Sequence, residues 1–155
     1  MSTSTMPALS APSKAAATSL LLTENWLRNA FISELHTVTA RKQSEGHPLS
    51  AVVVTLANPA TEAEQVPLMI VEVSDAPASE YPGEEAGRHA AAGVRDYWVI
   101  EAGARKLHVH RDPRPDPDAK YGASYKQVRT YGPNALVAPL AAEIHLAQVI
   151  NLLPW

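Results

Sequence analysis

A single carboxylate, Glu72, interrupts an otherwise apolar run at positions 68–74. Such a run predicts a central strand with both faces covered, so Leu68, Ile70 and Val73 are expected to be buried. A lone carboxylate on a buried strand is costly unless it is hydrogen-bonded, paired with a cation or bound to a metal ion. Glu72 is therefore the first candidate for a functional residue.

Two histidines, His108 and His110, alternate along a predicted strand and so share one of its faces. Imidazoles at this spacing can bind zinc, but a zinc site needs at least three protein ligands, and the sequence offers no third one. Two solvent-exposed histidines are the better interpretation.

Composition and short motifs exclude several classes of protein. The chain has no cysteine, no G-x-S-x-G and no glycine-rich loop ending in G-K-S/T, which excludes thiolate sites, nucleophile elbows and phosphate loops. The net charge of -3 shows no overall basic excess, so contact with nucleic acid needs a local basic patch or metal ions. The most basic region consists of Arg105, Lys106, Arg111, Arg114, Lys120, Lys126 and Arg129. Aspartates are interspersed in this region, so a solvated surface is a better interpretation than a phosphate-binding patch.

The elements that would position these side chains follow from the periodicity. Apolar residues at helical spacing predict a helix over Thr23–Lys42, and a second helix is predicted at Glu84–Ala92. Prolines predict an exposed loop over Asp112–Ala123. The second helix implies a parallel crossover and the last two strands a hairpin, which gives an α/β fold with a mixed central sheet flanked by helices. The predicted strands are Ala51–Leu56, Leu68–Ser74, Asp96–Ile100, Lys106–Arg111 and Tyr125–Tyr131.

The length of 155 residues and the hydrophobic content of 46% suit one globular domain. Residues 19–155 are predicted to form it, after a disordered tail at 1–18 that is rich in Ser, Thr, Ala and Pro. No run approaches the ~18 apolar residues of a membrane span, and no secretory signal is recognisable. The sequence therefore predicts a cytoplasmic protein without a membrane partner.

Three segments resemble a large bacterial family of restriction endonucleases, the Uma-two family. The family's P-x-L-v-v-E-V-x-S segment is similar to Pro67–Ala76, PLMIVEVSDA. Its Y-A-x-A-G-V-x-E-Y-W-v-v-D segment and the strand after it are similar to Ala90–Arg111, AAAGVRDYWVIEAGARKLHVHR. Its closing hairpin resembles Tyr125–Leu146. The resemblance implies a PD-(D/E)XK, restriction-endonuclease-like core. The hairpin expected ahead of the family's first long helix is not recognisable, which indicates a divergent or N-terminally shortened member.

In such a core, acids on neighbouring strands hold a divalent ion, and a basic residue, usually lysine, orients the attacking water. Carboxylate oxygens suit Mg²⁺ or Mn²⁺, and the ion assists phosphodiester hydrolysis. Carried over residue by residue, Glu72 matches the second acid and the Val73 carbonyl matches a backbone ligand. The first acid falls at Ser50 and the basic residue at Glu85.

These two replacements predict a degraded site with little or no metal-dependent cleavage. Asp75 is the nearest substitute acid, and Arg88 is the nearest substitute cation. Arginine is a poor general base, so pairing with Glu72 or Glu85 is the simpler role for Arg88. An active chain is expected to be a Mg²⁺- or Mn²⁺-dependent endonuclease acting on nucleic-acid phosphodiesters of DNA or RNA. DNA is a candidate partner, and a homodimer is compatible with the sequence. The alternative is a non-catalytic binding or assembly module that retains the nuclease fold.

Overall fold

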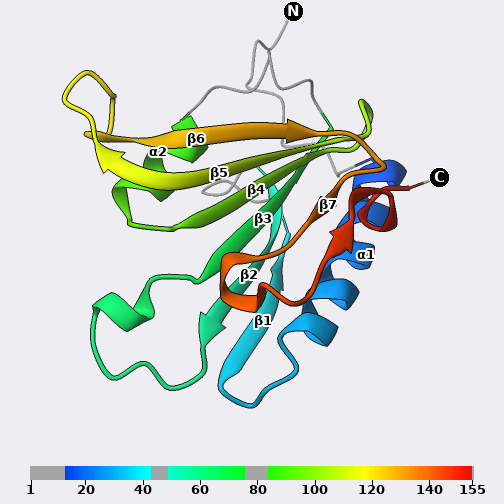
Figure 1. Ribbon diagram of the computed structural model, residues 1–155, viewed down its shortest axis with the longest axis horizontal. Coiled ribbons are helices and arrows are strands. Elements are labelled where there is room, and N and C mark those ends of the chain that lie inside the picture. Colours follow the sequence, from blue (N-terminus) through cyan, green and yellow to red (C-terminus); the bar gives the residue numbers. More distant parts are fainter. Residues whose placement is uncertain (1–12, 43–48, 76–83, 155) are drawn as a thin grey trace, which may run out of the picture.

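The computed structural model describes residues 13–42, 49–75 and 84–154. Its centre is a six-stranded sheet in the order β1-β2-β3-β4-β5-β6 (Figure 1). The strands are β1 (His36–Arg41), β2 (Ser50–Leu56), β3 (Met69–Ser74), β4 (Asp96–Glu101), β5 (Lys106–Pro115) and β6 (Ala123–Tyr131). β3 and β4 run parallel, and the other neighbours pair antiparallel. This is the α/β fold with a mixed central sheet that the sequence predicts.

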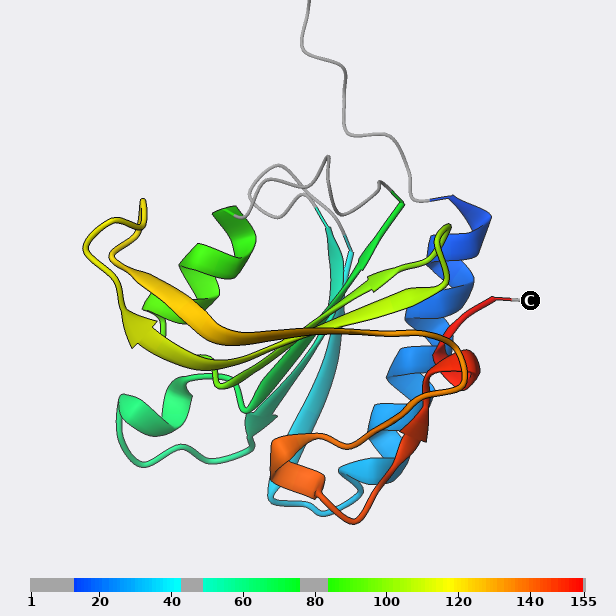
Figure 2. The same ribbon diagram turned by 45° about the horizontal axis from the view of Figure 1, so that its top comes forward.

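Two helices cover opposite faces of the sheet (Figure 2). α1 (Lys14–Ala30) packs against β1, β2 and β3, whereas α2 (Glu84–Ala91) packs against β5 and β6. A 3-10 turn, η1 (Ala63–Gln65), lies between β2 and β3. The C-terminal segment consists of β7 (Leu136–Val137), η3 (Leu140–Ala142), β8 (Ala147–Gln148) and η4 (Val149–Leu152). It lies on the α1 side, where η4 contacts α1.

Side chains alternate along the strands, which gives the sheet one core on each face. Val71 packs with Leu27 of α1 in the larger core. Ile70 and Tyr97 belong to the smaller core on the α2 side. The same alternation directs Glu72 toward α2. As predicted, β3 is central, and Ile70 is only 3% exposed, while Leu68, just before the strand, is partly buried.

The helix predicted over Thr23–Lys42 is wrong at both ends. α1 begins after Ser13, whose hydroxyl accepts a hydrogen bond from the backbone nitrogen of Ala16 (3.1 Å). Thr23 is buried in the middle of α1 and is not its N-cap. The chain then forms β1, whose alternating β-branched residues pair with β2. Leu35, which extended the helical pattern, is 70% exposed.

The N-terminal boundary of the folded part also differs from the prediction. Residues 14–18, which the sequence assigns to a disordered tail, belong to α1. Residues 1–12 lie outside the described residues. No helix in the described parts of the chain is long and apolar enough to cross a membrane.

β5 continues through Pro115, where the sequence predicts a loop from Asp112 onward. The ladder with β6 extends to the pairs Pro113↔Tyr125 and Pro115↔Ala123. β4 pairs with β5 only as far as Arg111. Proline is tolerated beyond that point because one side of β5 has no neighbouring strand there, so its missing N–H breaks no ladder bond.

Candidate metal site

β3 carries the carboxylate that the sequence singles out. Glu72 is fully buried. The Tyr97 hydroxyl, from β4, donates a hydrogen bond to its Oε1. Arg41, at the end of β1, donates from Nη2 to its Oε2 at 3.2 Å. Nε2 of His89, from α2, lies 3.5 Å from the same Oε2. Three other elements therefore converge on one buried carboxylate.

α2 brings a second carboxylate and an imidazole to this point. Glu85 and His89 are four residues apart, so they share a face of the helix. Nε2 of His89 lies 3.7 Å from Oε2 of Glu85. Arg88 donates a hydrogen bond to the other oxygen of Glu85 at 2.9 Å. Glu72, Glu85 and His89 each offer one ligand atom, and these atoms all lie within 4.8 Å of one another.

This set of side chains fits a divalent metal ion. Two carboxylates and one imidazole are common ligands of ions such as Mn²⁺ and Zn²⁺. Nε2 of His89 is buried without a hydrogen-bond partner, which is costly for a polar atom. An ion held by all three side chains would satisfy it. Among the described residues, no other three acidic or histidine side chains come this close together.

Known proteins share both the sequence pattern and the fold. The Uma2 family, described as "Putative restriction endonuclease", matches residues 4–147. The chain belongs to the Uma2 family. A crystal structure of a "putative nuclease belonging to DUF820" from Anabaena variabilis ATCC 29413 has a TM-score of 0.62 at 14% identity, over 91% of this chain and 81% of that one. No curated protein matches the chain. The Uma-two resemblance and the nuclease-like fold are thus confirmed.

Within this Uma2 chain, Ser50 does not lie beside Glu72. Ser50 pairs with Val73 in the β2–β3 ladder, and Ala51 pairs with Glu72. Directly paired residues point to the same face of a sheet, so Ser50 points toward α1 and Glu72 toward α2. Ser50 cannot take the place of a first acid next to Glu72. The Val73 side chain is buried on the α1 side, and a metal-binding role for its carbonyl stays a prediction.

The two proposed substitutes, Asp75 and Arg88, both have other partners. Asp75 is exposed and accepts hydrogen bonds from the hydroxyl and the backbone nitrogen (2.9 Å) of Ser13, the N-cap of α1. It therefore lies on the α1 side, whereas Glu72 faces α2. Arg88 pairs with Glu85, as predicted, and its Nε donates to the Tyr121 hydroxyl at 3.2 Å. Among the described contacts, neither residue touches Glu72.

The sequence does not predict the roles of three residues in the site. Glu85, for which the sequence predicts a misplaced charge, supplies the second carboxylate of the cluster. His89 is not among the predicted site residues, although its i,i+4 spacing from Glu85 can indicate two ligands on one helical face. The sequence carries no signal for Arg41, because the predicted helix over Thr23–Lys42 puts this residue near a helix end, whereas it lies on a strand beside β2.

The two strand histidines are partly buried, so their exposed interpretation is wrong. His108 lies between Oε1 of Glu101 and Oγ1 of Thr130, both at 2.8 Å. Nδ1 of His110 lies 3.3 Å from the Tyr97 carbonyl oxygen. Burial lowers the pKa of His110. Neither histidine belongs to a three-ligand group among the described residues.

Much of the predicted basic region is engaged within the protein. Partners are found for Arg105 (the Pro154 carbonyl), Arg111 (Asp96), Arg114 (Asp112) and Lys120 (Glu84). Paired cations attract phosphates less than free ones do. The solvated interpretation suits Arg114 and Lys120, whose side chains are exposed, whereas Arg105 and Arg111 are partly buried against their partners.

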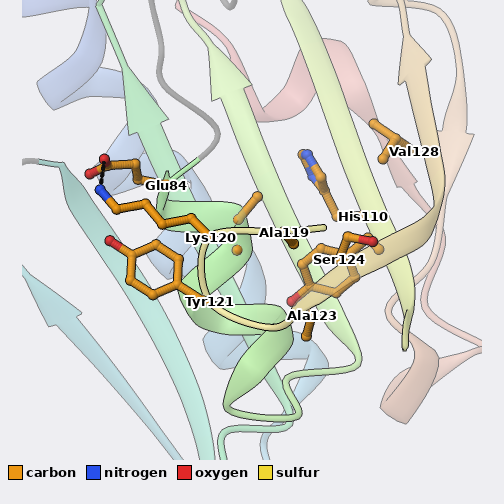
Figure 3. A pocket seen from close by; sticks show the side chains of 11 residues that line it. Glu84, His110, Ala119, Lys120, Tyr121, Ala123, Ser124 and Val128 are labelled. Atoms are coloured by element: carbon orange, nitrogen blue, oxygen red, sulfur yellow. Dashed lines mark hydrogen bonds and ion pairs between the residues drawn. The ribbon is translucent and has the colours of Figure 1, made fainter. Parts of the chain in front are cut away.

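A cavity of about 450 Å³ lies between α2, β5 and β6 (Figure 3). Small residues leave this space, notably Ala86 and Gly87 of α2 and Ala123 of β6. The Tyr121 ring closes one side, where a Cβ on Gly87 would come within 3.1 Å of it. The lining contains none of Glu72, Glu85 and His89, so this cavity is distinct from the candidate metal site.

Proposed function

We propose that this chain is a divalent-metal-dependent nuclease that hydrolyses nucleic-acid phosphodiesters, with Glu72, Glu85 and His89 as the metal-holding set. The observation that carries the proposal is the buried Nε2 of His89, which has no hydrogen-bond partner and lies 3.5 and 3.7 Å from two carboxylate oxygens. Membership of a family described as restriction endonucleases supports the choice of substrate.

When bound, a divalent ion stabilises negative charge on the phosphate and lowers the pKa of a water molecule. The residues of the chain orient the set. The Tyr97 hydroxyl fixes one oxygen of Glu72, and Arg88 fixes one oxygen of Glu85. The described contacts of this set include no lysine, so Arg41 is the nearest cation to Glu72 that can stabilise charge on a phosphate.

The three proposed ligands, Glu72, Glu85 and His89, also favour Mn²⁺ over Mg²⁺. Mg²⁺ prefers oxygen ligands in near-octahedral geometry, whereas imidazole suits softer first-row ions. A set of two carboxylates and one imidazole therefore supports Mn²⁺ over Mg²⁺.

In this proposal the two premises of the predicted degraded site change form, although no lysine among the described contacts replaces the expected basic residue. Glu85 contributes a ligand instead of misplacing a charge. The other premise remains in a new form, because the β2 position beside Glu72 is Ala51 and offers no carboxylate. The non-catalytic alternative has one observation in its favour: the ion pair between Arg41 and Glu72 already balances the buried carboxylate without a metal ion.

The test is cleavage of plasmid and single-stranded DNA in Mn²⁺ and in Mg²⁺. We expect activity in Mn²⁺ that exceeds activity in Mg²⁺. Glu85→Gln and His89→Gln should each lower the rate by roughly 10²-fold or more, the usual loss for one electrostatic group in a site. Glu24→Gln is the matched control, since Glu24 also lies on a helix and pairs with an arginine four residues away. Cleavage that is absent, or equal in the site variants and the control, would favour the non-catalytic module.

A further inference from the structure

Arg41 and the candidate ion position share one oxygen atom of Glu72. Oε2 lies 3.2 Å from Nη2 of Arg41 and 3.5 Å from Nε2 of His89. The other oxygen, Oε1, accepts the hydrogen bond of the Tyr97 hydroxyl. An ion held by Glu72, Glu85 and His89 would therefore bind the oxygen that the guanidinium already contacts. Two cations at one oxygen repel each other strongly where water is excluded, and Glu72 is 0% exposed.

The side chain of Arg41 makes few hydrogen bonds for an arginine that is paired with a buried acid. The one hydrogen bond of its side chain among the described residues is the contact with Glu72, and its Nε is buried without a partner. Arg111 gives the contrast, because both its Nε and its Nη2 bind Asp96, and Nη2 also binds the Ala138 carbonyl at 2.6 Å. Arg41 also stands at the end of an edge strand, with 25% of its side chain exposed. It can leave Glu72 without breaking any other described hydrogen bond.

We propose that Arg41 is an exchangeable counter-ion of this site. It occupies Glu72 when no metal ion is present, leaves the carboxylate when an ion binds, and then binds a phosphate oxygen of the substrate. The inference rests on the proposed function, because it takes Glu72, Glu85 and His89 as the residues that hold the ion.

The charges of the site support the second half of this exchange. Without an ion, the carboxylates of Glu72 and Glu85 are balanced by Arg41 and Arg88. A divalent ion adds two positive charges, which favour an anion nearby. A guanidinium matches a phosphate with two parallel hydrogen bonds. Arg41 is also the more accessible partner, since its side chain is partly exposed and Glu72 is not. Metal binding and phosphate binding should therefore strengthen each other.

The test measures Mn²⁺ affinity from the electron paramagnetic resonance signal of free Mn²⁺. We expect Arg41→Gln to lower the Kd for Mn²⁺ on the order of tenfold, a usual size for coupling between two sites. Arg41→Lys keeps the competing charge and should stay close to the unmodified chain. Arg28→Gln is the matched control, since Arg28 also pairs with one glutamate, on the surface of α1. It should leave the Kd unchanged.

A second measurement follows the released guanidinium. Binding of a phosphorothioate DNA, which resists hydrolysis, should be weaker for Arg41→Gln than for the unmodified chain when Mn²⁺ is present. Without Mn²⁺ the two should bind alike, because Arg41 is then engaged with Glu72. A third measurement uses the unmodified chain, so that misfolding of a variant cannot affect the result. The NMR signal of the Arg41 Nε–H should shift when diamagnetic Zn²⁺ is added.

The outcomes separate the two proposals. The counter-ion role is wrong if the Mn²⁺ affinity of Arg41→Gln is equal to or lower than that of the unmodified chain. It is also wrong if the NMR signal of the Arg41 Nε–H does not shift on addition of Zn²⁺. Neither result contradicts the metal site itself. Absence of Mn²⁺ binding in both the unmodified chain and Arg41→Gln overturns the metal site, and the exchange falls with it. Tighter Mn²⁺ binding together with metal-dependent loss of DNA affinity supports the exchange.

Discussion

At the scale of single residues, buried polar groups are stable here where each polar atom finds a partner. Both oxygens of Glu72 accept hydrogen bonds, one from Tyr97 and one from Arg41. Nε of Arg41 and Nε2 of His89 are the exceptions around this carboxylate, and of the two only the imidazole nitrogen can act as a metal ligand. Because a buried polar atom without a partner costs free energy, the His89 imidazole is where this arrangement favours a ligand.

His110 should make the stability of the protein depend on pH. Burial lowers its pKa below the ordinary value of 6.5, and the nearby His108 lowers it further, against the Tyr97 carbonyl and Glu72. The unfolded chain therefore binds more protons than the folded chain just below pH 6.5, so the free energy of unfolding falls as the pH falls through that value. The slope is at most about 1.4 kcal/mol per pH unit, the limit for one proton.

Urea unfolding between pH 5 and 8 (roughly the range in which histidine titrates) measures this effect. His110→Phe keeps the ring between Tyr97 and Tyr125, at 5.0 and 5.6 Å, and should flatten the pH dependence. The exposed His145 provides the control substitution, His145→Phe. An identical pH dependence in both variants would contradict the assignment to His110.

At the scale of elements, the sequence predicts most strands but not the first helix. β3 is readable because its apolar run is continuous, and α2 because acids, a proline before it and a glycine after it mark its ends. α1 was misplaced because the spacing of Leu27 and Phe31 suits a helix while Leu35, on the surface, continues the pattern by chance. Local periodicity cannot tell a buried face from an exposed one, and this error also hid Arg41 on β1.

The contact between Asp75 and Ser13 should stabilise α1 and leave the metal site unaffected. Ser13→Ala removes the N-cap and should lower the free energy of unfolding by about 1 kcal/mol. Asp75→Ala should lower it too, and the double variant should lose less than the sum because both act through one contact. Mn²⁺ affinity should be unchanged in all three. A weaker Mn²⁺ affinity in Asp75→Ala would restore Asp75 as a substitute acid.

At the scale of the whole molecule, one buried carboxylate joins the sheet to the C-terminal segment. Asp96, at the start of β4 and 1% exposed, accepts hydrogen bonds from Trp98 Nε1 (2.7 Å), Arg111 Nε (2.9 Å) and the Leu140 backbone nitrogen (2.9 Å). Five of the six strands of the sheet could be predicted from the sequence, because each of these five carries its own pattern of apolar and polar residues. This junction could not, since its partners come from three separate segments and only the folded chain brings them together.

Asp96→Ala should therefore be among the most destabilising single substitutions in the chain. It leaves the guanidinium of Arg111, which is 22% exposed, without its buried partner, and removing one member of a buried ion pair costs about 3–5 kcal/mol. Replacing both residues, as in Asp96→Ala with Arg111→Met, should recover part of that loss because no buried charge is left unpaired. Arg114→Gln breaks the surface pair with Asp112 and should change the free energy of unfolding by less than about 1 kcal/mol. Urea unfolding of the three variants measures the difference. A loss in Asp96→Ala no larger than that in Arg114→Gln would mean that the C-terminal segment is held to the sheet by its apolar contacts alone.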